Sequence, residues 1–107
     1  MQTIWISDRI RLKLAEKHGG VSEDEIRQCF ENLEPGWNYI RDTRDGHYSD
    51  PPTYWFISET NRRRQLKVVF IPRKVDTPDG QKVRIDIKSA FPPNAAEIAL
   101  YTRRGQC

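Results

Sequence analysis

The sequence is poor in cysteine and histidine. Its 107 residues include two cysteines, Cys29 and Cys107, and two histidines. The cysteines form no Cys-x-x-Cys pair and stand at no metal-ligand spacing from a histidine, which argues against a zinc site and against a disulfide scaffold. We therefore expect no metal ion and no cofactor. Cys29 falls on the apolar face of a predicted helix, where a free thiol usually behaves as a small buried hydrophobe.

Long apolar runs are also missing. The run Tyr54-Trp55-Phe56-Ile57 has four residues, whereas a membrane-spanning helix needs roughly 18. The first residues do not show the charged, apolar and small-residue order of a secretory signal. We therefore expect a cytoplasmic protein without membrane contact. Three Trp, four Tyr and four Phe supply enough bulky side chains for one core, so we expect a single domain over residues 1–107.

Charge of one sign is concentrated in the second part of the chain. Residues 1–40 hold five Lys or Arg and seven Asp or Glu, whereas residues 41–107 hold thirteen and eight. The net charge of the whole chain is +3. A basic surface of this kind suits either a polyanion such as RNA or an acidic protein partner. Charge alone leaves both open.

Local signals predict an α+β fold. Ser22 with Glu25 forms a capping box, and Val21 with Ile26 forms a hydrophobic staple, so a helix begins there; Pro35-Gly36 ends it. Other patterns predict helices over 8–18 and 95–103 and strands over 3–6, 53–60, 65–72 and 82–89. We expect a short N-terminal strand and two helices, an antiparallel sheet of three to four strands, and a C-terminal helix capped by Asn94.

Basic residues on the last two predicted strands suggest a binding face. If the apolar residues of both strands share the core side, Lys67 lies beside Lys88 and Arg84 on the other side. Like charges so close destabilise a sheet unless an anion or an acidic partner lies between them. Arg73 belongs to the same hairpin. Neutralisation within the chain, by Glu59 and Asp86, is the alternative.

Further candidates lie in turns. The run Arg62-Arg63-Arg64 at a hairpin tip either grips phosphates with its guanidinium groups or forms a solvated turn whose charge discourages edge aggregation. His47, in a polar loop, and His18, at a predicted helix end, have side chains that titrate near neutral pH. Trp37 and Tyr54 either stack on unpaired bases or pack in the core.

Two segments carry a family resemblance. The segment Lys17-His18-Gly19-Gly20-Val21-Ser22-Glu23-Asp24-Glu25 resembles the signature near the start of BrnT-type toxins, which belong to the RelE ribonuclease superfamily. Val83-Arg84-Ile85-Asp86-Ile87-Lys88-Ser89-Ala90, followed by Glu97 and Tyr101, resembles the closing pattern of that family. The likeness extends over most of residues 10–104. It implies a RelE-like compact sheet with helices on one side.

The resemblance implies a toxin that cleaves messenger RNA, free or on the ribosome, and a small antitoxin protein that neutralises it. Cleavage through the 2′-hydroxyl needs a base, an acid and positive charge at the phosphate, and it needs no metal ion. Our hypothesis assigns charge to Lys67, Arg73 and Lys88, the base to Glu59 or His47, and RNA contacts to the four residues Arg62, Arg63, Arg64 and Arg84. The alternative is a non-catalytic interaction module that binds an acidic protein segment.

Overall fold

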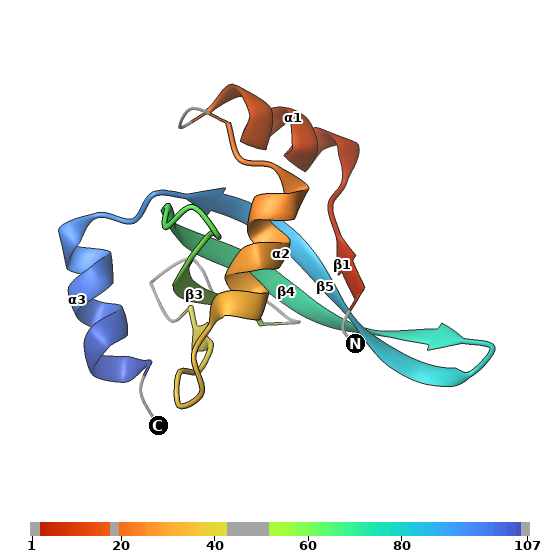
Figure 1. Ribbon diagram of the computed structural model, residues 1–107. Helices are drawn as coiled ribbons and strands as arrows, with labels where there is room; N and C mark the ends of the chain where they lie inside the picture. Colours follow the sequence, from red (N-terminus) through yellow and green to blue (C-terminus); the bar gives the residue numbers. More distant parts are fainter. Residues whose placement is uncertain (1–2, 18–19, 43–51, 106–107) are drawn as a thin grey trace.

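The computed structural model describes residues 3–17, 20–42 and 52–105 and confirms the α+β class (Figure 1). Along the chain the elements are β1 (Thr3–Trp5), α1 (Asp8–Glu16), α2 (Glu23–Asn32), β2 (Ile40–Arg41), β3 (Tyr54–Glu59), β4 (Gln65–Thr77), β5 (Gly80–Phe91) and α3 (Ala95–Arg104). Among these described residues, no helix is long and apolar enough to span a membrane.

The helices begin where the sequence predicts because their caps are local. The Ser22 hydroxyl accepts from the Glu25 amide, and the Glu25 carboxylate accepts from the Ser22 amide, which completes the capping box of α2. Asn94 and Glu97 make the same reciprocal pair at α3, where the sequence predicted only the Asn94 cap. The Ser7 hydroxyl caps α1. Helix α1 ends at Glu16, before the predicted end at His18.

The sheet differs from the prediction in size and in direction. It has five strands in the order β1-β5-β4-β3-β2 and is mixed, because β1 runs parallel to β5 while the other pairs are antiparallel. The prediction of a purely antiparallel sheet of three to four strands is therefore wrong. The chain between β1 and β5 includes two helices and the strands β2, β3 and β4, and a connection of that length allows a parallel pair.

A β-bulge between β4 and β5 overturns the predicted cluster of lysine and arginine side chains. Val69 pairs with Ser89 and Phe70 pairs with Ile87, so Lys88 is an extra residue without a partner on β4. Because the bulge shifts the register, Lys67 lies opposite Phe91. The expected juxtaposition of Lys67 with Lys88 and Arg84 is wrong. The cross-strand pair of like charge is Arg73 with Arg84.

The main core lies between α2 and one face of the sheet. Phe56, Val68 and Phe70 point to this face and are almost fully buried. Phe30 of α2 packs its ring against Phe56 and Phe70, with centroids 4.7 and 5.6 Å apart. Strand β3 is buried on both sides, as its nearly all-apolar centre predicted.

Helix α3 packs against the opposite face. Trp55 and Lys67 alternate with the core residues of β3 and β4, so they point away from α2. The Tyr101 ring lies 5.7 Å from the Trp55 ring, and the Glu97 carboxylate contacts the Lys67 ammonium. The expectation that the helices all lie on one side of the sheet is therefore wrong for α3.

We expect the thiol of Cys29 to be unreactive in the folded protein. The residue is fully buried, and burial, with a smaller contribution from Glu25, raises its pKa to about 12. Only a minute thiolate fraction then exists at pH 8. A Cys107→Ser variant should give no fast reaction with a thiol reagent such as Ellman's reagent until denaturant is added. Rapid labelling without denaturant would contradict the burial of this side chain.

Candidate functional site

The structure has a cleft of about 710 Å³. It lies along the edge of β3 that continues past the short pair with β2, and it is walled by the end of α2, the β3–β4 turn and α3. A cleft of this volume is in the range of ligand sites. Two residues of the predicted site, Glu59 and Arg63, line it together with Trp37 and Tyr101.

The β3–β4 turn owes its shape to Thr60. Its buried hydroxyl accepts from the amides of Arg62 and Arg64, at 3.3 and 3.1 Å, and its carbonyl accepts from the Arg63 amide at 2.9 Å. This places Arg63 in the left-handed region, with φ 64°. A non-glycine residue is uncommon there, and such strain persists where the surroundings impose it.

Side chains of α2 hold the turn in place. Gln28 accepts from the Asn61 amide at 2.9 Å, and the Asn32 amide group donates to the Glu59 carbonyl and to the Asn61 side chain, each at 2.9 Å. The backbone of Glu59 is thus held by Asn32, while its exposed side chain is open to a ligand. Asn32 itself lines the cleft.

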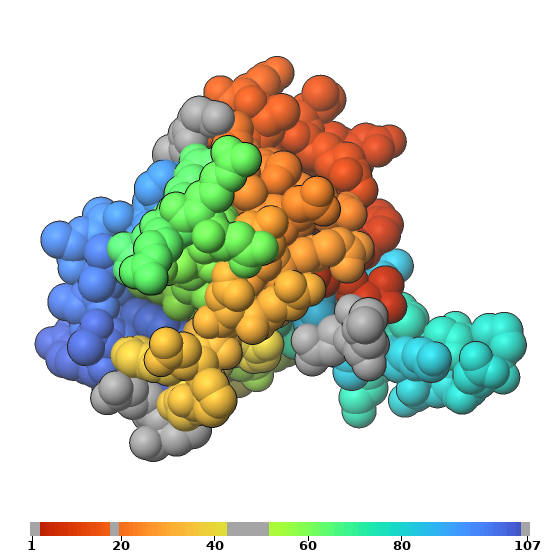
Figure 2. All heavy atoms as spheres, in the orientation of Figure 1, coloured from red at the N-terminus to blue at the C-terminus, as the bar shows by residue number. Residues whose placement is uncertain are grey.

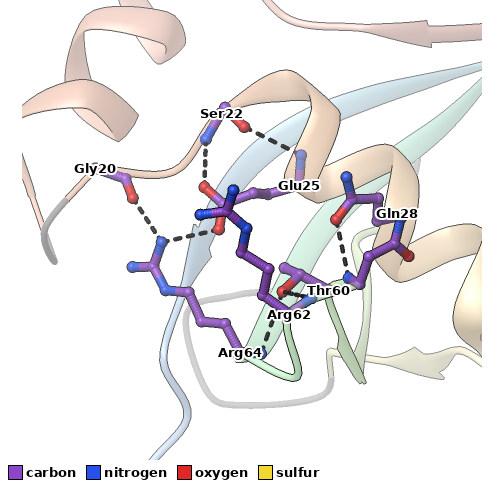
Figure 3. Close-up of polar contacts among 8 residues, drawn as sticks. Gly20, Ser22, Glu25, Gln28, Thr60, Arg62 and Arg64 are labelled. Atoms are coloured by element: carbon purple, nitrogen blue, oxygen red, sulfur yellow. Dashed lines mark hydrogen bonds and ion pairs between the residues drawn. The ribbon is translucent and has the colours of Figure 1, made fainter.

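The three consecutive arginines of the turn have different surroundings. Arg64 turns back toward α2, where its guanidinium donates to the Gly20 carbonyl at 2.7 Å and to the Glu25 carboxylate at 3.1 Å (Figure 3). This contact ties the turn to the capping box of α2. Arg62 and Arg63 are exposed, and Arg63 lines the cleft. Of the three arginines predicted to grip phosphates, Arg62 and Arg63 are therefore exposed, while Arg64 has a structural contact.

An aromatic pair forms the wall on the α3 side. The rings of Trp37 and Tyr101 are stacked with centroids 5.2 Å apart. The Tyr101 hydroxyl donates to the Asn38 carbonyl at 2.9 Å. Burial, and then the charge on Tyr39, raises the pKa of Tyr101 to about 12, so the phenol keeps its proton at neutral pH. Tyr101 supports the half-buried Trp37 ring, which offers a stacking surface to the cleft.

Lys67 lies away from the cleft and from solvent. Its ammonium group contacts the Glu97 carboxylate at 2.6 Å and lies over the Trp55 and Phe91 rings, 4.5 and 5.5 Å from their centroids. The side chain is 5% exposed. A buried charge needs such partners. The geometry gives Lys67 a structural contact with α3, and the residue lines a small hollow of about 100 Å³ together with Arg41 and Arg104.

The remaining predicted residues lie elsewhere. Arg73 and Arg84 face each other on β4 and β5, roughly 25 Å along β4 from the turn. Asp86 contacts both of them, as the alternative of internal neutralisation anticipated. Lys88 is exposed at the bulge. His18 and His47 lie outside the described residues. Among the described residues, the cleft therefore brings Glu59 and Arg63 together, with Arg62 and Arg64 beside Arg63 in the same turn, while Lys67, Arg73, Arg84 and Lys88 lie away from it.

Sequence reasoning missed several lining residues. Tyr101 was named as part of the family's closing pattern and as a buried helix position but not as a site residue, and Asn32 was not singled out. The stacked partner of Tyr101 is Trp37, which the sequence did offer as a candidate for base stacking. No local pattern shows that residues so distant in sequence meet; only the packing of α3 against β3 does so.

Comparison with known proteins adds no further assignment. The chain matches no protein-family model, and no curated protein matches it significantly. In the part of the chain that the structure describes, no three His, Cys, Asp or Glu side chains group as a metal site requires.

The Lys67 contact leads to a stability prediction. Lys67→Met keeps the length of the side chain and removes its charge, which leaves Glu97 without this partner. We expect the free energy of unfolding to fall by about 3 kcal/mol, as is typical of a broken buried ion pair. Lys88→Met removes an exposed charge and should stay within about 0.5 kcal/mol of the parent. Urea unfolding of both variants measures the difference; equal effects would contradict a structural role for Lys67.

The backbone of Arg63 leads to a second stability prediction. Left-handed conformation costs an L-residue about 1–2 kcal/mol, which glycine avoids, while glycine adds about 0.5–1 kcal/mol of chain entropy. Arg63→Gly should therefore raise the free energy of unfolding by about 0.5–1 kcal/mol. Arg62→Gly has no positive φ to relieve and should lower it by a similar amount. Thermal or urea unfolding compares the pair, and a loss of stability in both would show that Arg63 is not strained.

Proposed function

We propose that the chain is a metal-independent endoribonuclease of the toxin type and that the cleft beside β3 is its active site. One observation carries this proposal: Glu59 and Arg63, both exposed, line the same cleft. These are the group that takes a proton from a 2′-hydroxyl and the group that holds the charge of the reacting phosphate. The Trp37 ring in the same cleft supplies a stacking surface for an unpaired base.

In the proposed reaction Glu59 removes the proton of the ribose 2′-hydroxyl. The 2′-oxygen forms a bond to the adjacent phosphorus, the bond to the 5′-oxygen breaks, and that oxygen takes a proton from water. The products are a 2′,3′-cyclic phosphate and a 5′-hydroxyl end. Arg63, and the neighbouring exposed Arg62, stabilise the extra negative charge on the phosphorus oxygens during the transfer. His47, outside the described residues, stays the second candidate for proton transfer.

The strain at Arg63 supports this assignment. The position favours glycine by its φ angle, yet it holds a residue whose guanidinium fork matches phosphate oxygens. Strained backbone of this kind clusters at functional sites. The Asn32 and Gln28 contacts hold the turn rigidly, so that Glu59 and Arg63 keep their relative places before RNA binds.

The proposed biological role follows from the resemblance to BrnT-type toxins. A ribonuclease that cleaves messenger RNAs of many sequences in the cytoplasm would arrest growth. A cognate antitoxin would then have to cover the cleft or hold the chain inactive. The antitoxin is proposed as a small protein partner.

We expect Glu59→Gln to abolish cleavage while leaving RNA bound. The amide cannot accept the proton, so the cleavage rate should fall by about 10²–10⁴-fold. Glu34→Gln is the matched control, since Glu34 also lines the cleft and loses the same charge; its rate should stay near that of the parent. The measurement is the formation of cyclic-phosphate ends on a short RNA in the presence of EDTA, with binding followed separately by anisotropy.

The same variants can be induced in a bacterial host while total RNA is followed. Arrest with fragmented messenger RNA for the parent and Glu34→Gln, and normal growth for Glu59→Gln, is the expected result. Equal toxicity of Glu59→Gln would remove Glu59 from the mechanism. Normal growth with intact RNA for the parent, at good soluble expression, would overturn the ribonuclease proposal.

The second candidate function is a non-catalytic interaction module that binds an acidic protein segment. The observation that favours it is the strand edge along the cleft. Strand β2 pairs only with Tyr54 and Trp55, and among the described residues no other strand pairs with that edge of β3 between Phe56 and Glu59. An extended peptide can add to such an edge. Intact RNA together with binding of an acidic peptide would favour this function.

A further inference from the structure

The outer part of the β4–β5 hairpin projects from the body of the protein (Figures 1 and 2). Its two faces carry different residues. Arg73 pairs with Arg84 and Val75 pairs with Lys82, so these side chains share one face. Trp5 pairs with Asp86, which places the indole on that face as well. Lys74, opposite Val83, points to the other face.

Asp86 holds the two arginines in place. It accepts hydrogen bonds from Nε and Nη2 of Arg84 at 2.6 and 3.0 Å, and it forms an ion pair with Arg73, whose Nε lies 2.7 Å from a carboxylate oxygen. Its side chain is only 10% exposed, whereas that of Arg73 is 44% exposed. The hydrogen bond to Asp86 raises the pKa of Arg84. A carboxylate that fixes two guanidinium groups reduces the ordering entropy that an anion would otherwise have to overcome.

This face keeps positive charge after the internal contacts are made. Arg73, Arg84 and Lys82 contribute three cations, and Asp86 contributes one anion. Asp86 takes only the Nε of Arg73, so among the described residues the two Nη groups of Arg73 keep donors for a ligand. Paired guanidinium donors fit the oxygens of a phosphate group. They also fit a carboxylate, so the arginines favour an anion over a neutral ligand more strongly than they favour phosphate over carboxylate.

The aromatic neighbour narrows the class of ligand. Trp5 is 45% exposed, an unusual exposure for a residue of this size, and the Arg84 guanidinium lies 4.6 Å from its ring centroid. A flat aromatic surface beside fixed phosphate-binding groups is the arrangement that binds single-stranded nucleic acid, in which the base stacks and the backbone phosphate is neutralised. An acidic protein segment would use the cations but gain little from the indole.

We propose that Trp5, Arg73 and Arg84 form a binding subsite for one nucleotide of single-stranded nucleic acid, with the base on Trp5 and the phosphate on the arginines. The subsite lies roughly 25 Å along β4 from the cleft. Only the choice of RNA as the natural ligand of this subsite rests on the proposed function. The subsite anchors the strand and takes no part in bond cleavage.

The test uses fluorescence anisotropy with a short, labelled 2′-O-methyl RNA, which cannot be cleaved through its blocked 2′-oxygen. Arg73→Ala should weaken binding and lower the slope of log K against log salt by about one. Lys74→Ala is the matched control, because it removes the same charge from the next residue but from the other face. The affinity of the Lys74→Ala variant for the RNA should change by less than about twofold. Trp5→Leu keeps apolar bulk without a ring and should weaken binding by roughly tenfold.

Thermal unfolding of each variant establishes that it is folded before binding is compared. Equal weakening by Arg73→Ala and Lys74→Ala, with Trp5→Leu unchanged, would show nonspecific attraction and overturn the subsite. Displacement of the RNA by a polyglutamate peptide whose binding depends on Arg73 would assign the face to an acidic protein partner and overturn it as well. Because the probe is not cleaved, the subsite can fail while Glu59-dependent cleavage stands, and the reverse also holds.

Discussion

The arrangement of the molecule depends on the burial of the Lys67 charge. A buried ammonium group requires a partner, and Glu97 of α3 supplies it across the face that α2 leaves uncovered. This contact fixes α3 against β3 and β4, and Tyr101 then packs against Trp55 and supports Trp37. One wall of the cleft is therefore set by an ion pair on the far side of the central strand, although neither charged residue belongs to the cleft.

Features that depend on neighbouring residues were predictable. The capping box of α2 and the cap at Asn94 follow from side chains within three residues of each other, so the sequence states them directly. The burial of Cys29 follows from helical spacing. Within the candidate site, Arg63 was predicted from the basic run at the turn and Glu59 as the base of the implied cleavage, and because the two residues are close in sequence the chain itself brings them to one cleft.

Features that depend on distant residues were not predictable in this way. The parallel pairing of β1 with β5 joins segments separated by most of the chain. The bulge at Lys88 leaves no local mark, because the alternation from Val83 to Ile87 is regular up to it; the single extra residue nevertheless changes which side chains meet Lys67. The placement of α3 on the second face depends on how α2, the sheet and α3 pack together as three layers. For this reason the predicted cluster of Lys67, Lys88 and Arg84 on the sheet is wrong, whereas the phosphate contacts predicted for the turn stay a prediction.

The projecting hairpin has a consequence for how this protein can vary between relatives. Its outer residues lie beyond the packed helices, so insertions and deletions there leave the core untouched. Side chains alternate with a period of two, however, so removing one residue from each strand would turn every side chain beyond that point to the opposite face. Changes in length nearer the tip than Arg73 and Arg84 leave these two side chains in place, whereas changes closer to the body of the protein keep them on the Trp5 face only in steps of two residues per strand.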